Sequence, residues 1–361
     1  MVTFSLCMIV KNEAAVLRRC LSSIADLMDE IIIVDTGSND DTKEIAAEFT
    51  DKIYDYAWTD DFAAARNFAF SKATMEYIYS ADADEVVDEE NHIRFQQLKQ
   101  VLMPEVEIVQ MYYVTPPEYN TASNFIKEYR PKLYRRLRTF RWIDAVHETV
   151  CLEPVVFDSE IEILHLPQSM HSSRDFRLFG LAFAREGRLS AKLHSMYAKE
   201  LFISGEDEDF AEATPVFEAT LVRSDATGDM IREAICVLCH AYRIAGQTDR
   251  FFSMAFKLMP DSLCAELCCE VGSHFFDRKD YQEAIQWFET AAYRTEAVID
   301  IRRSGVVPLS ALSACYGMLA KELQPASPIP LLPEHEELIR QCEEQAGRYR
   351  KEADEWRMPT E

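Results

Sequence analysis

The sequence predicts an α/β domain with a mostly parallel sheet, followed by an all-α domain of helical repeats. Strand-like and helix-like segments alternate up to about residue 167, and the strand signals vanish after about residue 174. In the second half, a pattern of small and large residues recurs after 33 residues (272 − 239). We therefore expect one domain at residues 1–175 and a second at residues 176–361.

The first domain is expected to begin with the order β-α-β-α-β-α-β, which is typical of a parallel sheet with right-handed crossovers. The apolar run that follows Glu30 is unbroken, as expected for a strand buried on both faces. Ligands of such sheets bind beyond the carboxyl ends of the strands. We expect strands at residues 5–10, 30–34, 52–56 and 76–80, and helices at residues 14–28, 42–49 and 62–73.

The second domain is predicted to consist of helix pairs. Gly272 and Phe275, followed by Ala284 and Phe288, have the spacing of a tetratricopeptide (TPR) repeat, although a generic helical bundle is an alternative. A weaker copy upstream contains a short acidic insertion at residues 206–209, and the proline-rich stretch 325–333 is expected to precede a final charged helix.

Composition limits the partners. The chain has 38 Lys and Arg against 62 Asp and Glu, and its formal charge of −24 argues against nucleic acid and anionic membranes. No apolar run approaches the ~20 residues that span a bilayer, and the first ten residues do not resemble a signal peptide. The ten cysteines, including the pair Cys236 and Cys239, are expected to be small core residues in a reducing cytoplasm.

Asp82 and Asp84 directly follow the fourth expected strand. Residues two apart lie on the same side of an extended backbone, so both carboxylates are expected to face one ligand. Together they can hold a hard divalent cation that also binds phosphate oxygens. Such a cation would provide a local positive charge within an acidic protein.

Two further polar groups occupy positions where ligands are expected. Asp35 ends the second strand and can accept a hydrogen bond from a base or a ribose hydroxyl, while Gly37 lets the backbone approach a ligand closely. An Asx turn that caps the next helix is the alternative. Arg66 and Asn67 lie on a mostly apolar helix, where Arg66 is either a buried ion-pair partner or a planar donor to a nucleotide.

His147 and Glu148 end an apolar segment that follows the basic residues 130–138. The histidine can ligate a cation or pair with a pyrophosphate, and the glutamate can accept a proton from an attacking group. His165 and His171 are interpreted as structural or rim residues.

These motifs together resemble the family 2 glycosyltransferases of the GT-A fold, a Rossmann-like sheet, in a subgroup with a TPR-like tail. Some bacterial peptide S- and O-glycosyltransferases have this architecture. The resemblance covers the first half closely and the second half by architecture. It depends on residues 7–13, 31–38, 65–67, 82–85 and 146–148.

The resemblance implies a metal-dependent, inverting transfer of a sugar from a nucleotide-diphospho-sugar, of the UDP type, to a peptide, protein or glycan acceptor. Mn²⁺ or Mg²⁺ would be bound by Asp82, Asp84 and His147, and Glu148 would be the catalytic base, although the acidic-pair motif usual for that base is missing. The implied donor contacts are Lys11, Asn12, Glu13, Asp35, Gly37, Ser38, Arg66, Asn67, Asp82 and Ala83.

Two other functions stay open, together with a homo-oligomeric state. One is an inactive, nucleotide-sugar-binding TPR scaffold. The other is a sugar-nucleotide pyrophosphorylase, which usually has a Gly-rich basic loop after its first strand. Residues 11–13 do not provide such a loop.

Overall fold

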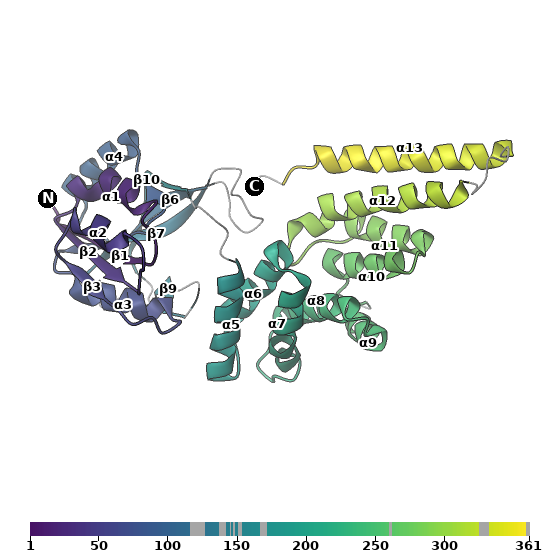
Figure 1. Cartoon of the computed structure of the whole chain (residues 1–361), viewed down its shortest axis with the longest axis horizontal. Coiled ribbons are helices and arrows are strands. Elements are labelled where there is room, and N and C mark those ends of the chain that lie inside the picture. Colours follow the sequence, from purple (N-terminus) through teal and green to yellow (C-terminus); the bar gives the residue numbers. More distant parts are fainter. Residues whose placement is uncertain are drawn as a thin grey trace. The chain divides into compact units, whose positions relative to one another are not determined.

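The computed structural model describes residues 1–115, 127–136, 142–144, 146, 149–150, 154–166, 172–259, 262–324 and 332–358. The chain divides into two compact units, Met1–Ala182 and Phe183–Glu361. The boundary predicted at residue 175 lies within the helix in which this division falls, Ser172–Glu186 (α5). The predicted fold class, an α/β domain followed by an all-α domain, is confirmed (Figure 1).

The first unit contains, in its described part, an eight-stranded mixed sheet of order β3-β2-β1-β4-β7-β6-β10-β5. The first four strands in this order are parallel, as predicted, whereas β7 runs antiparallel to both β4 and β6. The strands are β1 (Phe4–Val10), β2 (Glu30–Asp35), β3 (Ile53–Asp55), β4 (Tyr77–Ser80), β5 (Glu85–Val86), β6 (Ile108–Val114), β7 (Lys127–Arg135) and β10 (Val156–His165), with the separate pair β8 (Trp142–Ile143) and β9 (Thr149–Val150).

Helices cover both faces of this sheet (Figure 1). Alternate residues of β1 point to opposite faces. Leu6 and Met8 pack into the core under α1 and α4, whereas Cys7 packs with Ala69 of α3 on the other face. Burial on both faces explains the unbroken apolar run of β2. The helices are α1 (Leu17–Ile24), α2 (Thr42–Ala47), α3 (Phe62–Lys72) and α4 (Glu89–Val101), and a 3₁₀ turn, Ala25–Leu27, follows α1.

The second unit consists of consecutive helices that pack as neighbours. The helices α9 and α11 begin 33 residues apart (281 − 248), in agreement with the predicted repeat. A Cβ at Gly272 would lie 2.9 Å from the ring of Phe288, so the small residue is required by the large one. The elements are α6 (Ala191–Ser204), α7 (Asp207–Thr220), α8 (Gly228–Ile244), α9 (Thr248–Leu258), α10 (Ala265–Asp277), α11 (Tyr281–Tyr293), η3 (Ile301–Ser304), α12 (Val306–Leu323) and α13 (Pro333–Glu355).

The prediction of an acidic insertion at residues 206–209 is wrong, because these residues form the start of α7. Glu206 and Asp209 form a capping box at the start of α7, where carboxylates accept free backbone N–H groups. The proline-rich residues 325–331 lie outside the described residues, and α13 begins with Pro333 at its first turn.

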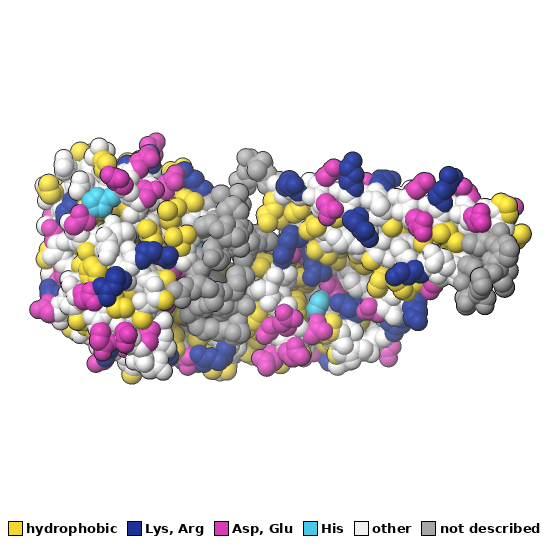
Figure 2. Space-filling view, turned by 45° about the horizontal axis from the view of Figure 1, so that its top comes forward, with side chains coloured by type: hydrophobic (Ala, Val, Ile, Leu, Met, Phe, Trp, Pro, Cys, Tyr) yellow, Lys and Arg dark blue, Asp and Glu magenta, His cyan; other side chains and the backbone are white. Residues whose placement is uncertain are grey.

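The cysteines that the structure describes are free and buried, as expected for core residues. Cys236 lies 3.5 Å from Cys264, sulfur to sulfur. Within the described ranges, no helix combines the length and the apolar character that a bilayer crossing requires. The faces visible in Figure 2 carry acidic and basic side chains intermixed.

Candidate functional site

The polar clusters found in the sequence lie at one end of the strands, where the parallel strands β1, β2 and β4 finish. Val10 of β1 pairs with Asp35 of β2, and Cys7 pairs with Ser80 of β4. Because these strands are parallel, the segments that follow them leave the sheet at their carboxyl ends, where ligands of such sheets bind. Asp35 and Asp82 therefore flank the end of β1 from its two neighbours.

The loop after β1 is tied to the loop after β2. The backbone N–H of Asn12 donates to the hydroxyl of Ser38 at 2.9 Å, and the N–H of Asn39 donates to the side-chain oxygen of Asn12 at 2.9 Å. The N–H of Glu13 donates to the hydroxyl of Thr42. Asn12 has a φ of +56°, a conformation that asparagine tolerates better than most residues. The residues predicted to contact the nucleotide-sugar in these two loops thus hold each other in place by hydrogen bonds.

Asp35 shapes the turn that follows β2. Its carboxylate accepts hydrogen bonds from the N–H groups of Gly37 and Ser38, each at 3.0 Å to Oδ2, and only 1% of the residue is exposed. Gly37 has a φ of +103°, which glycine adopts without a steric penalty. The described contacts of Asp35 are therefore those of its own turn and an ion pair with Lys43 at 3.9 Å. The first N–H of the next helix donates to the carboxylate of Asp40 and not to that of Asp35.

Asp82 is an open carboxylate held by Arg66. The guanidinium of Arg66 donates to Ser80 Oγ at 2.9 Å and to Asp82 Oδ1 at 3.0 Å, and 45% of the Asp82 side chain is exposed. The partial loss of water around the carboxyl group opposes its ionisation. The charges of Arg66 and Lys132 outweigh that effect and hold the pKa of Asp82 below its usual range. Asp82 is therefore expected to be ionised, and it is accessible at the carboxyl end of β4.

The prediction that alternation places Asp82 and Asp84 on one side of an extended strand is wrong. The strand β4 ends at Ser80, and the N–H of Glu85 donates to the carbonyl of Asp82, which closes a turn. Ala83, a predicted donor contact, is buried in this turn. As a result, Asp82 faces Arg66, while Asp84 faces a different partner.

That partner is His165, at the end of β10. Its Nε2 lies 3.1 Å from Asp84 Oδ2, its ring packs at 4.9 Å from the ring of Tyr113, and its Nδ1 is buried without a hydrogen-bond partner in the described structure. His165, which is expected from the sequence to be a structural or rim residue, therefore contacts a candidate site carboxylate. Its position at the end of an apolar strand was the available signal.

Carboxylate and imidazole are ligands that Mn²⁺ accepts. Asp84 and His165 thus provide two adjacent groups of suitable chemistry. Within the described ranges, however, no cluster of three or more His, Cys, Asp or Glu side chains is arranged to hold a metal ion. His147, the predicted histidine ligand, and Glu148, the predicted base, lie outside the described residues.

The basic segment predicted to bind a diphosphate is divided by the geometry of β7. Lys132 is buried and pairs with Glu85 at 2.7 and 2.8 Å, and Arg130 lies over the ring of Tyr113 at 3.9 Å. Arg130 also lies close enough to Asp82 to lower its pKa. Arg135 and Arg136 lie beside the start of β4, at the opposite end of the strands from the site. Only the first part of this segment therefore belongs to the site.

Asn67 holds the backbone of Trp142. Its amide nitrogen donates to the carbonyl of Trp142 at 3.0 Å, and its amide oxygen accepts the N–H of Trp142 at 2.9 Å. Arg66 lies over the same indole ring at 5.2 Å. Because both polar atoms of the Asn67 side chain are occupied, the structure makes it a residue that positions β8.

Residues 5–151 match the family model described as glycosyl transferase family 2. The first half of the chain is therefore similar to the family 2 glycosyltransferases. The match includes the loops after β1, β2 and β4 that form the candidate site, so the resemblance inferred from the motifs is confirmed.

Individual relatives match parts of the chain. The glycosyltransferase SunS of Bacillus subtilis is 33% identical over 158 residues, which cover 42% of this chain and 35% of SunS. A TPR repeat-containing protein of Synechococcus elongatus is 52% identical over 85 residues, which cover 24% of this chain and 21% of that protein. The matches thus span about a fifth to a third of these relatives.

Solved structures were also compared with the chain. Residues 1–349 of TarS from S. aureus superpose on 70% of this chain and 90% of that one, with 13% sequence identity and a TM-score of 0.39. Glucosyl-3-phosphoglycerate synthase from Mycobacterium tuberculosis, in complex with Mn²⁺ and UDP-glucose, superposes on 53% of this chain and 81% of that one, with 12% identity and a TM-score of 0.36.

Proposed function

We propose that the chain transfers a sugar from a nucleotide-diphospho-sugar of the UDP type to a hydroxyl or thiol of a peptide, protein or glycan. The observation that carries the proposal is Asp82, which is accessible and paired with Arg66 at 3.0 Å after the carboxyl end of β4, within the residues that match the family 2 glycosyltransferase model.

A chain with a formal charge of −24 repels a diphosphate unless positive charge is concentrated at the site. Arg66 is paired with Asp82 and Lys132 with Glu85, so neither is a free countercharge. Asp84 and His165 are the residues that would hold a divalent cation. When bound, such a cation stabilises the negative charge on a leaving diphosphate.

Other residues of the chain would position the donor and activate the acceptor. Arg66 fixes Asp82, which is placed to accept hydrogen bonds from the ribose. Arg130 is also paired, with Glu128, but its charge lies near enough to Asp82 to favour anions on this side of the site. Asn67 holds the segment that begins at Trp142. We assign proton removal from the acceptor to Glu148, by the family resemblance.

In this reaction the acceptor oxygen or sulfur forms a bond with the anomeric carbon. The bond between that carbon and the diphosphate oxygen breaks, and its electron pair leaves with the nucleoside diphosphate. The acceptor proton passes to Glu148. In-line attack inverts the anomeric centre, and the helical unit offers a surface for the acceptor.

A panel of nucleotide-sugars tests the proposal, with release of the free nucleoside diphosphate as the readout. With Mn²⁺ present, we expect one uridine sugar to be consumed faster than the others, and we expect EDTA to stop the release. Binding of the same sugars without any release would instead identify a nucleotide-sugar-binding scaffold. If the chain neither binds any of these sugars nor releases a nucleoside diphosphate from them, the proposal is contradicted.

A further inference from the structure

The indole of Trp142 lies against the guanidinium that holds Asp82. Trp142 opens β8, and Cζ of Arg66 lies over its ring at 5.2 Å from the ring centre. The same guanidinium donates to Ser80 Oγ at 2.9 Å and to Asp82 Oδ1 at 3.0 Å. A cation over an aromatic face within about 6 Å is attracted by the ring. The indole is thus one of the groups that determine where the guanidinium of Arg66 points.

This contact is largely withdrawn from water. The side chain of Arg66 is 12% exposed, and Trp142 is 8% exposed. A cation–π contact is stronger where its partners are desolvated. The other partner of the guanidinium, Asp82, is accessible, and an ion pair with an accessible carboxylate is worth little by itself. The indole therefore adds to the interactions that keep Arg66 in one orientation.

The indole itself is fixed by its ring and by its backbone. The rings of Phe70 and Tyr134 pack against it, with centroid distances of 5.7 and 5.4 Å. The side chain of Asn67 holds the backbone of Trp142 through two hydrogen bonds, at 3.0 and 2.9 Å. Arg66 and Asn67 are adjacent on α3. One helix therefore presents the guanidinium and also holds the residue against which the guanidinium lies.

The polar atom of the indole takes no part in this arrangement. Nε1 of Trp142 is buried and has no hydrogen-bond partner within the part of the chain that the structure describes. A buried donor without a partner costs free energy and does not hold a ring in place. The aromatic face is therefore the part of Trp142 that acts on Arg66, and phenylalanine is the replacement that preserves such a face.

We propose that Trp142 is a positioning residue of the donor site, which acts through Arg66 on Asp82. Its aromatic face keeps the guanidinium where the two terminal nitrogens reach Ser80 and Asp82, so that the carboxylate keeps one orientation toward the nucleotide-sugar. This role depends on the proposed function, in which Asp82 contacts the ribose. The contact between Trp142 and Arg66 does not depend on it.

The Nε–Hε resonance of Arg66 in the ¹⁵N-labelled full chain reports the contact without any ligand. Protons over the face of an aromatic ring are shielded, and the resonance is identified by its loss in Arg66→Lys. We expect it to move downfield in Trp142→Leu, which removes the aromatic face and keeps an apolar side chain. In Trp142→Phe, which keeps a ring and lacks the unpartnered N–H, it should remain close to its wild-type position.

Calorimetric titration of UDP in the presence of Mn²⁺ measures the consequence for the donor site. We expect the affinity to fall about five- to thirtyfold in Trp142→Leu and less than about threefold in Trp142→Phe. Phe68→Leu is the matched control. Phe68 lies two positions from Arg66, on a different face of α3, and packs against Tyr54 and Tyr56. This variant should leave both the UDP affinity and the Arg66 resonance unchanged.

Three results would overturn the proposal. They are an unmoved Arg66 resonance in Trp142→Leu, an unchanged UDP affinity in that variant, and an equal loss of affinity in Phe68→Leu. Asn67→Ala keeps the test decisive if Trp142→Leu does not fold, because it frees the backbone of Trp142 and leaves the indole present. The Arg66 resonance should then move and the UDP affinity should fall, and no change in either would overturn the proposal.

The two readouts separate this proposal from the proposed function. If the wild-type chain binds no UDP with Mn²⁺ present, the proposed function fails. The Arg66 resonance in Trp142→Leu and Trp142→Phe still decides whether the indole positions the guanidinium. If UDP binds and the resonance does not respond to Trp142→Leu, the proposed function stands and the role of Trp142 is contradicted.

Discussion

Carboxylates at the sheet edge and carboxylates in the helical unit differ in how completely the protein satisfies them. Asp82 and Asp84 have side chains that are 45% and 21% exposed, and they face Arg66 and His165, respectively. Glu266 and Glu270 are fully buried, and each accepts at least three hydrogen bonds. A carboxylate with open oxygens can bind a ligand, whereas one surrounded by donors stabilises the fold.

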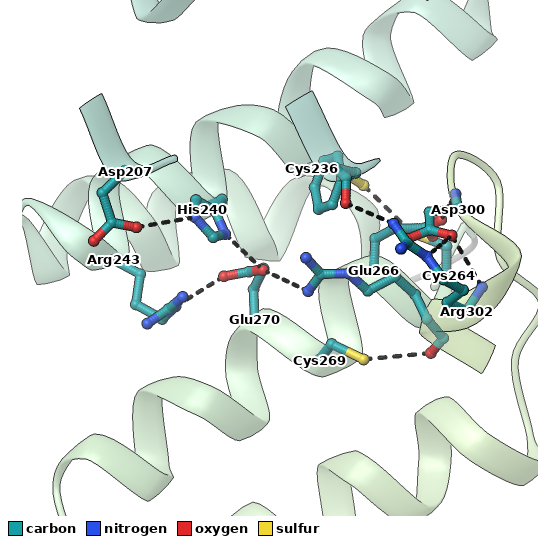
Figure 3. Close-up of polar contacts among 12 residues, drawn as sticks. Asp207, Cys236, His240, Arg243, Cys264, Glu266, Cys269, Glu270, Asp300 and Arg302 are labelled. Carbon is teal, nitrogen blue, oxygen red and sulfur yellow. Dashed lines mark hydrogen bonds and ion pairs between the residues drawn. The ribbon is translucent and has the colours of Figure 1, made fainter. Parts of the chain in front are cut away.

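Glu270 is the clearest structural case. It accepts from His240 Nδ1 at 2.9 Å, from Arg243 Nε at 2.8 Å and from Arg303 at 3.2 Å. Figure 3 shows the contacts with His240 and Arg243 as dashed lines. Asp35 shows that position alone does not decide whether a carboxylate is open to a ligand or satisfied by the fold. It ends a strand at the ligand edge, yet its carboxylate is bound by its own turn.

The largest expected effect is on stability, in Glu270→Ala. Removing this carboxylate leaves the buried charges around it unpaired, so we expect a loss of about 3–5 kcal/mol in the free energy of unfolding. Urea denaturation of the full chain measures it. Glu344→Ala, on an exposed position of α13, should change the value by less than about 0.5 kcal/mol. Equal losses in both variants would remove the distinction between the two classes.

Asp84→Asn should act on catalysis instead. We expect donor turnover to fall at least about a hundredfold, with stability nearly unchanged, because the open carboxylate contributes to a ligand site and little to packing. The readout is release of the nucleoside diphosphate. Glu89→Gln, an exposed neighbour at the start of α4, is the control. Full turnover in Asp84→Asn would exclude Asp84 from the site.

Acid should weaken the helical unit through Glu270. Burial alone would raise the pKa of its carboxyl group, but His240, Arg243 and Arg303 outweigh this and hold the pKa well below the usual range. Because the pKa is lower in the folded state, the stabilisation is complete above the unfolded value of about 4.3 and is lost as the pH falls below it. Unfolding followed from pH 6 to pH 3 should show a steeper loss in the wild-type chain than in Glu270→Gln. Parallel curves would contradict this assignment.

The smallest effect concerns packing between the two helices of one repeat, α10 and α11. In Gly272→Ala the new Cβ would lie 2.9 Å from the Phe288 ring, and we expect a loss of about 1–3 kcal/mol. Gly317→Ala, on α12, meets no atom within 4 Å and should stabilise the chain by roughly 0.4–1 kcal/mol. Thermal unfolding of both variants measures the difference. A stable Gly272→Ala would show that the helices separate easily at this point.

The sequence predicted the features that depend on local pattern. The apolar run of β2 and the helical repeat were identified because burial and periodicity are written in neighbouring residues. The contact between Asp84 and His165 was missed because it joins residues 81 positions apart in the chain. The antiparallel pairing of β7 has the same origin, since strand partners are chosen by the whole sheet. The turn after Ser80 replaced the extended backbone on which the alignment of Asp82 and Asp84 depended.

Titration of UDP into the full chain, with Mn²⁺ and then with EDTA, tests the central claim most directly. The claim is that the open carboxylates after β4 make a metal-assisted diphosphate site. We predict binding with Mn²⁺ that weakens at least about tenfold in EDTA, and equally in Asp84→Asn with Mn²⁺ present. The same affinity under all three conditions would contradict it.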